Sequence, residues 1–205
     1  QPPELAPIEN VERPQRQRWR FVGARYAPSS PLGDGLADRV GATIAEIDES
    51  NKFFNSNLKT SPPLRSENDV KNLFKGLKDG TIDCIASNHS PVKFDDKDND
   101  FYNSKSGIIG LETAFASSHT KLIENGFTTE SILKFFSLNP AKIMNVDLSS
   151  FKVGVDAELV IIDPTKRWTF SSNDIYSKSS NTPFVGQEFV GKIYATICKS
   201  NLFIN

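Results

Sequence analysis

Apolar residues in the middle of the chain recur with a helical period and then with the spacing of a strand. Four of them stand at positions i, i+3, i+4 and i+7: Val70, Leu73, Phe74 and Leu77. This spacing predicts a helix that is capped by Ser66 and ends near Lys78 and Gly80. The short apolar run at 82–86 predicts a buried strand directly after it. A helix that leads into such a strand is half of a βαβ unit, so the pattern favours an α/β protein.

The pattern continues with three more helices and then changes to strands. We expect a second helix over about 110–124, a third capped by Thr128 or Thr129, and a short fourth opened by Asn139 and Pro140. The second helix is expected to bury Leu111, Ala114, Phe115, Leu122 and Ile123. After Gly154 the sequence predicts strands at 158–162, 168–170, 192–198 and 202–204. The chain is therefore expected to end in a small β unit.

Charge usage separates the amino-terminal part from the rest. Six of the eight arginines precede residue 40, whereas the first of the sixteen lysines is Lys52. Residues 1–35 are rich in Pro, Gly and Arg, with one apolar run at 19–26, which is typical of an extended arm. An interaction arm is one explanation. A separate origin of the first 45 or so residues, by fusion or chimeric assembly, is the other, and the sequence leaves both open.

Overall composition excludes several classes of function. The formal net charge of −1 gives no reason to expect nucleic acid or an anionic membrane as partner. The sequence has no membrane-spanning apolar run, and Gln1 to Glu4 does not open a secretory signal. Cys84 and Cys198 each lie in an apolar run, which favours reduced, buried thiols and a cytoplasmic setting.

The loop after the strand at 82–86 carries the candidate chemistry. In parallel α/β proteins catalytic groups stand at the carboxyl ends of strands, where Asn88 and His89 lie. For each of these residues a structural role is favoured over a catalytic or metal-binding one. We expect Asn88 to be a turn residue, His89 to be a packed, hydrogen-bonded ring, and His119 to be a solvated helix residue. The acidic tract at 95–100 only superficially resembles a calcium loop, because Phe101 stands where glycine is needed, so we expect a solvated, mobile loop there.

Six ordered motifs resemble those of bacterial-type dihydroorotases. They are Ser61-Pro62-Pro63-Leu64-Arg65, Gly80 to Ala86, Gly107-Ile108-Ile109-Gly110-Leu111-Glu112-Thr113, Asn139-Pro140-Ala141, Gly154 to Pro164, and Ser177 to Phe184. The resemblance covers about 53–205, with no match in 1–50. It implies an α/β fold in which partial TIM-barrel-like βα units are followed by a small β unit, after an extended amino-terminal segment. We expect three parts: a lead segment at 1–50, a partial amidohydrolase barrel at 51–150, and a small β domain at 151–205.

The resemblance implies zinc-dependent, reversible cyclisation of N-carbamoyl-aspartate in pyrimidine biosynthesis, but the site residues are degenerate. The family's proton-accepting aspartate falls on Asn88, and an amide can neither act as a general base nor supply negative charge. The substrate-binding positions fall on Ser61, Val92, Ser106 and Gly107, of which only Gly107 is unchanged. The family's histidine ligands would lie upstream of Ser61, and the chain has two histidines, His89 and His119. No metal site and no cofactor are therefore expected in this chain, and residual substrate recognition would rest on Arg65 or the Gly107 backbone.

Three hypotheses on function follow. The first is a dihydroorotase-like hydrolase of pyrimidine biosynthesis that is inactive as this chain. The second is a non-catalytic structural partner of aspartate transcarbamoylase, and the third is an engineered or chimeric chain. A complete barrel takes about 250 residues, so a partial one leaves uncovered faces. We therefore expect self-association or contact with another protein chain.

Overall fold

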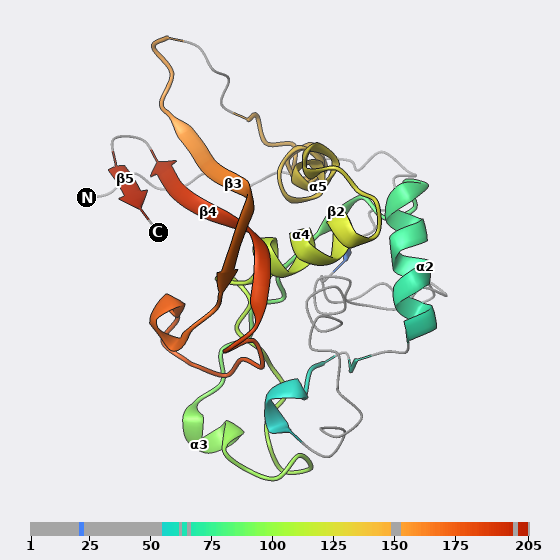
Figure 1. Cartoon of the computed structure of the whole chain (residues 1–205), viewed down its shortest axis with the longest axis vertical. Helices are drawn as coiled ribbons and strands as arrows, with labels where there is room; N and C mark the ends of the chain where they lie inside the picture. Colours follow the sequence, from blue (N-terminus) through green and yellow to red (C-terminus); the bar gives the residue numbers. More distant parts are fainter. Residues whose placement is uncertain are drawn as a thin grey trace, which may run out of the picture.

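The computed structural model describes residues 55–61, 63–64, 67–148, 153–198 and 201–204, together with the backbone of 21–22 (Figure 1). The expected amino-terminal arm, the Ser66 cap and Arg65 lie outside the described residues. The elements in chain order are β1 (Phe21–Val22), the 3-10 turn η2 (Ser56–Leu58), α2 (Glu67–Lys78), β2 (Cys84–Ile85), α3 (Phe94–Lys97), α4 (Ala114–Glu124), α5 (Thr129–Phe136), α6 (Leu138–Met144), β3 (Glu158–Thr169), η3 (Ser172–Asp174), β4 (Glu188–Cys198) and β5 (Asn201–Ile204). No helix of this described part is long and apolar enough to cross a membrane.

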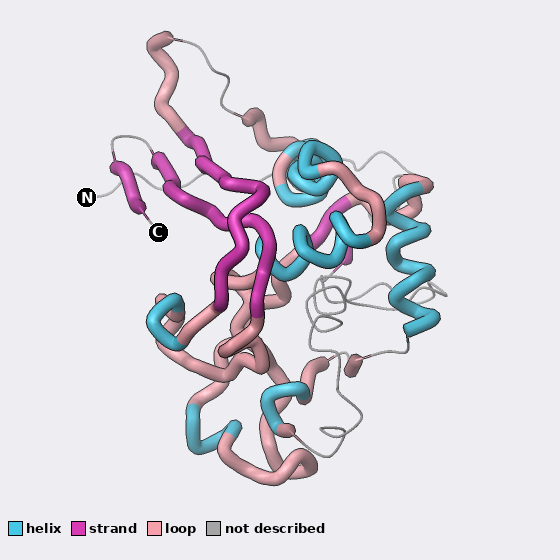
Figure 2. Tube along the Cα trace, viewed as in Figure 1, coloured by secondary structure: helices cyan, strands magenta, loops and turns pink. Residues whose placement is uncertain are grey.

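Two sheets are present in the described residues. β1 and β2 pair in parallel, with Phe21 opposite Cys84, as expected of strands joined by a helical crossover. β3, β4 and β5 form an antiparallel sheet in that order. In Figure 2 the long β3–β4 hairpin lies beside α4, while α2 stands on the other side of β2.

The first hydrophobic core joins the helices to β2. It contains Val70, Leu73, Phe74, Leu77, Ile82, Ile85, Phe115, Leu122, Phe127, Ile132 and Phe135. The residues at helical spacing in α2 are all in this core, so the helix predicted there is confirmed together with its buried face. Each fully buried Leu, Ile or Phe side chain contributes about 2 kcal/mol of transfer free energy.

A second core lies between α4 and the β hairpin. Ala116 of α4 packs with Phe170, Phe184 and Phe189, and Trp168 packs against this group. Because Phe115 belongs to the first core and Ala116 to the second, neighbouring residues of α4 face the two cores. α4 therefore connects the helical part to the β unit.

The helix boundaries differ from the sequence expectations at two places. α4 begins at Ala114 instead of near residue 110, and Leu111 is 65% exposed in the turn that precedes it. α6 begins at Leu138, and Asn139 does not cap it but donates its side-chain amide to the Asp83 carbonyl at 2.7 Å. Thr128 caps α5 as predicted, since its hydroxyl accepts the Ser131 amide at 3.2 Å.

The two strands predicted at 158–162 and 168–170 are one element. β3 runs through Asp163 and Pro164, and the pairing with β4 shifts register between Asp163 and Arg167. Asp163 accepts hydrogen bonds from the Thr165 and Lys166 amides there, so the expected turn is a bulge within a continuous strand.

Besides that of Leu111, three burial predictions are wrong: Ile123 is 39% exposed, and Cys198 and His119 also differ from the expectation. Cys84 and Cys198 form no disulfide in the described structure, and Cys84 is buried as expected, but Cys198 is exposed at the end of β4. His119 was expected to be solvated, yet its side chain is only 1% exposed. The polar neighbours of His119 in the sequence indicated a solvated helix face, but Ser117 and Ser118 are themselves buried.

His119 joins three elements. Its Nδ1–H donates to the Val190 carbonyl of β4 at 2.9 Å, and Nε2 accepts the Thr129 hydroxyl of α5 at 3.0 Å. Thr120, next to it on α4, accepts the Val190 amide at 2.9 Å. Gly191 makes this approach possible, because a Cβ there would lie 2.7 Å from His119 Nδ1 and its φ is +93°.

Burial lowers the pKa of His119 below its ordinary value of 6.5, against the opposing effect of the Val190 hydrogen bond. Protons then bind more tightly to the unfolded chain, so the stability present above pH 6.5 should fall as the pH decreases below that value. We predict that His119→Gln lowers the free energy of unfolding by about 2 kcal/mol at pH 7.5 and flattens this dependence. Urea unfolding at pH 7.5, 6.5 and 5.5 measures both effects.

His89→Gln is the matched control, since the chain contains two histidines. An unfolding free energy that loses its pH dependence equally in both variants would contradict the role given to His119.

Candidate functional site

The loop that follows β2 brings Asn88 to Ser61. Asn88 has a left-handed backbone with φ +43°, a conformation that asparagine tolerates better than most residues. Its side-chain amide donates to the Ser61 carbonyl at 3.4 Å. The structure thus places two of the predicted site positions in contact, and Asn88 combines the turn geometry with a position at the end of a parallel strand.

Val92 and Gly107 meet on the same loop framework. A Cβ on Gly107 would lie 2.8 Å from Val92 Cγ2 and 2.7 Å from the Ser90 carbonyl oxygen, so only glycine fits here. Gly107 also has φ +146° and donates its amide to the Lys59 carbonyl at 2.9 Å. Ser106 precedes it and is half-buried. All five predicted site positions therefore belong to one connected set of loops, while their roles in binding or catalysis stay predictions.

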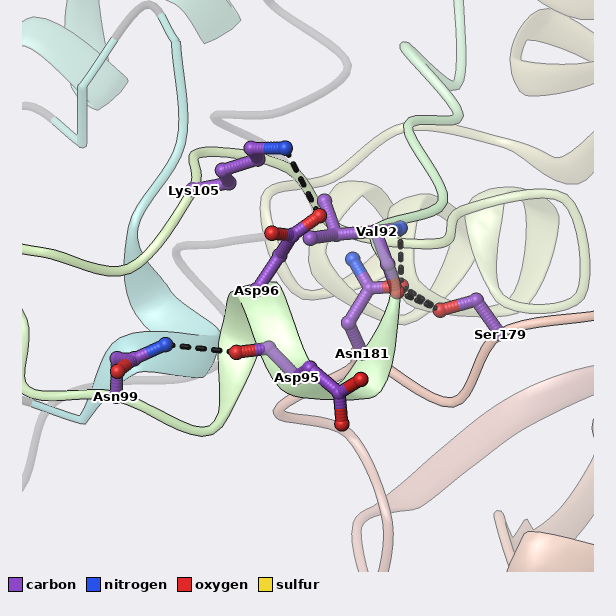
Figure 3. A network of polar contacts seen from close by, with 7 residues as sticks. All are labelled: Val92, Asp95, Asp96, Asn99, Lys105, Ser179 and Asn181. Carbon is purple, nitrogen blue, oxygen red and sulfur yellow. Dashed lines mark hydrogen bonds and ion pairs between the residues drawn. The ribbon is translucent and has the colours of Figure 1, made fainter.

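Asn181 holds these loops together. Its Oδ1 accepts the Val92 amide at 3.0 Å, and its Nδ2 donates to the Ser90 and Gly107 carbonyls at 3.1 and 3.0 Å. Its own backbone carbonyl accepts the Ile109 amide at 3.0 Å. Figure 3 shows Asn181 between Val92 and Ser179, whose hydroxyl donates to Asn181 Oδ1 at 2.5 Å and also contacts the Val92 carbonyl.

The acidic tract at 95–100 is an organised turn beside this network. Asp96 pairs with Lys105 at 2.8 Å, and Asn99 donates to the Asp95 carbonyl at 2.7 Å (Figure 3). Lys97 is 4% exposed and donates to the Lys59 and Lys105 carbonyls. Burial, and then the charge of Lys59, lower the pKa of Lys97 to about 8. The exposed loop expected there is therefore partly wrong, because its centre includes a short helix and a buried lysine.

The described residues do not fit a zinc site. Zinc requires several imidazole, thiolate or carboxylate ligands within one coordination sphere. No group of three His, Cys, Asp or Glu side chains that could hold a metal occurs in the part of the chain that the structure describes. Asn88, which the resemblance predicts at the position of the aspartate, carries a side-chain amide, and the His89 Nδ1 accepts from the amides of Gly110 and Leu111 at 3.2 and 3.4 Å.

Glu112 is a polar group that the sequence reading did not single out. Its Oε1 accepts the Ser177 and Tyr176 amides at 2.7 and 3.2 Å and so fixes the loop that leads to Asn181. Burial raises the pKa of Glu112, but hydrogen bonds, chiefly those with Ser177, outweigh the effect of burial, so the net pKa is lowered. Within the described residues, the buried Oε2 has no hydrogen-bond partner.

A cleft of about 520 Å³ opens beside Glu112. One wall carries His89, Glu112 and Phe115, and the other carries Trp168, Lys192 and Ile193 of the β hairpin. Because two backbone amides donate to His89 Nδ1, its ring proton is assigned to Nε2. The cleft therefore combines an apolar lining with a few polar groups, which is the usual make-up of a small-molecule site.

Solved structures with a similar backbone define the class of fold. A D-hydantoinase from Bacillus sp. AR9 matches with a TM-score of 0.63 and 24% identity over 73% of this chain and 34% of that one. A dihydropyrimidinase from Brevibacillus agri NCHU1002 matches with a TM-score of 0.65 and 21% identity over 80% and 36%. The expected α/β fold, partial TIM-barrel-like βα units followed by a small β unit, is confirmed.

Sequence comparison then gives the family. The model of the amidohydrolase family matches residues 28–203, and the chain belongs to that family. A dihydroorotase of Clostridioides difficile is 39% identical over 183 residues, which is 89% of this chain and 42% of that protein. A dihydroorotase of Syntrophus aciditrophicus is 37% identical over 155 residues, 76% of this chain and 36% of that protein. The chain thus spans less than half the length of these relatives.

The resemblance found from the motifs is confirmed, but it begins earlier in the chain than the motifs indicated. The family match begins at residue 28 instead of near residue 53, so it includes the change from arginine to lysine usage between Arg39 and Lys52. The six motifs could not show this, because none of them lies upstream of Ser61.

The loop framework provides a direct prediction for Gly107. Gly107→Ala should lower the free energy of unfolding by at least about 2 kcal/mol, since the new Cβ would overlap the Ser90 carbonyl and the Val92 side chain. Thermal and urea unfolding measure this loss.

Gly154→Ala is the matched control. Gly154 also has a positive φ, +93°, but a Cβ there meets nothing within 4 Å, so only the backbone cost of about 1 kcal/mol is expected. Equal losses at the two positions would show that close packing at Gly107 is unimportant.

Proposed function

We propose that this chain is the carboxyl-terminal part of a dihydroorotase-like amidohydrolase of pyrimidine biosynthesis, and that it has no hydrolase activity as this chain. The observation that carries the proposal is the Asn88 amide at the end of β2, where the resemblance expects the proton-accepting aspartate. The identity of 37–41% to proteins named dihydroorotase supports the choice of cyclic amide chemistry over other amidohydrolase reactions.

The chemical argument rests on what position 88 must do. Hydrolysis of a cyclic amide needs a group that takes a proton from the attacking water and returns it to the leaving nitrogen. A carboxylate does this, and a side-chain amide does not, because its oxygen is a very weak base. The Asn88 Nδ2 moreover donates a hydrogen bond to the Ser61 carbonyl, whereas a general base must accept a proton.

The loops around this position keep a defined shape although the reactive group differs. Gly107, Val92 and Ser90 are packed at contact distance and hydrogen-bonded through Asn181. Such a framework supports recognition of a ligand by backbone groups even where turnover is lost.

A second function, as a non-catalytic partner of another chain, is favoured by the β unit. In the antiparallel sheet the last strand, β5, exposes Leu202, Phe203 and Ile204 by more than half of their surface each. A sheet edge with exposed apolar residues is typical of a surface that pairs with another protein. We propose self-association or an aspartate transcarbamoylase as the candidate partner, which light scattering and co-purification would distinguish.

The test of the proposed function is hydrolysis of dihydroorotate by the purified chain. Three samples are compared: the unmodified chain with Zn²⁺, the same chain with a chelator, and Asn88→Asp with Zn²⁺. We expect no metal-dependent turnover by the unmodified chain. Turnover that appears only in Asn88→Asp would support the amide as the cause, and Asn173→Asp, an exposed position in η3, is the control for added charge.

Metal-dependent turnover by the unmodified chain would contradict the proposal. It would mean that Asn88 does not occupy the position at which the proton is transferred, or that a second copy completes the site.

A further inference from the structure

We propose that the cleft between the turn before α4 and the β3–β4 hairpin binds a small amphipathic molecule of amino-acid type, with a carboxylate, an N–H donor and an apolar body. This inference goes beyond the proposed function and does not rest on it. It is carried by the lining of the cleft and by an acceptor atom that the fold leaves unpaired.

The N–H donor of the ligand is inferred from the unpaired carboxylate oxygen of Glu112. Its Oε1 is occupied by the Tyr176 and Ser177 amides, whereas its Oε2 is buried and has no partner among the described residues. A buried carboxylate oxygen without a donor is costly, and such an atom calls for a water or a ligand group. Glu112 lines the cleft, so an N–H group bound there could supply the missing hydrogen bond.

The carboxylate of the ligand is inferred from two lysine ammonium groups that line the cleft. Lys178 and Lys192 both line the cleft, and neither forms an ion pair with a carboxylate in the described part of the chain. Lys192 Nζ lies 5.0 Å from the centre of the Trp168 ring, and the indole N–H is fixed on the Gly191 carbonyl at 3.1 Å. This stacking orders the ammonium group at the hairpin wall.

The balance of charge selects a zwitterion over a simple anion. Two acidic residues, Glu112 and Asp174, face the same space as the two lysines. Asp174 uses its Oδ2 for the Ser171 amide and hydroxyl, so its contribution is mainly the charge. The lining also includes Phe115, Ala116 and Ile193, which offer apolar surface to a side chain of the ligand. A volume of about 520 Å³ accommodates a molecule of this size.

The test uses three probes that differ in one group each: L-phenylalanine, phenylacetate without the amine, and phenethylamine without the carboxylate. Binding is followed by the indole N–H resonance of Trp168, which is one of two tryptophans in the chain. The metal is left out and no turnover is measured, so the result is independent of hydrolase activity. We expect L-phenylalanine to bind with a Kd of about 1 mM or lower and each truncated probe to bind at least about tenfold more weakly.

Two variants and a control locate the site. Glu112→Gln keeps the Oε1 acceptor for the loop amides but turns the unpaired oxygen into a donor, and Lys192→Met removes the ammonium while keeping the stem over Trp168. Each should weaken L-phenylalanine binding about tenfold or more. Lys166→Met, an exposed lysine of β3 outside the cleft, should leave binding unchanged.

The proposal is overturned if L-phenylalanine does not shift the Trp168 signal at millimolar concentration, or if both variants bind it like the unmodified chain. Phenylacetate that binds as tightly as L-phenylalanine would remove the donor requirement assigned to Glu112. A loss of folding in Glu112→Gln, seen as a lowered melting temperature, leaves Lys192→Met as the deciding variant.

Discussion

The hydrogen bonds of Asn181 are the interaction on which the candidate site depends. One side chain satisfies the amide of Val92 and the carbonyls of Ser90 and Gly107, three groups from two loops that lie far from it in sequence. Each of these backbone groups would otherwise be an unpaired polar group at a poorly hydrated position, at a cost of about 1–3 kcal/mol. The loops are therefore connected through the protein's own polar groups.

The β unit is joined to the helical part in a similar way. His119 and Thr120 of α4 provide partners for both backbone groups of Val190, at a point where Gly191 lets the helix approach the strand. Glu112 adds a third connection, because it fixes the loop at 176–177 from the turn before α4. Glu112 thus binds the loop with Oε1. The same residue lines the cleft, and its Oε2 is unpaired in the described structure. This division explains how a structural contact and a candidate binding site share one side chain.

The sequence predicted what local patterns determine. The helical spacing of Val70 to Leu77 and the Thr128 cap gave α2 and α5, and the motifs around Asn88 and Gly107 gave the family and the set of loops that meet. Contacts between distant segments could not be predicted. The burial of His119 depends on Val190, 71 positions away, and the network of Asn181 depends on loops 74 to 91 positions away. The unpaired Glu112 oxygen likewise has no signature in the sequence, since it depends on how the turn before α4 packs against the loop at 176–177.

Amide hydrogen exchange at Val92 tests most directly whether the Asn181 side chain fixes the site loops. The Val92 amide is bound to the Asn181 side chain, whereas the Ile109 amide is bound to the Asn181 backbone carbonyl, so Ile109 is an internal control. The account predicts slow exchange at both amides with or without chelator, and in Asn181→Ala a loss of protection at Val92 with Ile109 still protected. Fast exchange at Val92 in the unmodified chain, or protection that appears only when Zn²⁺ is added, would contradict it.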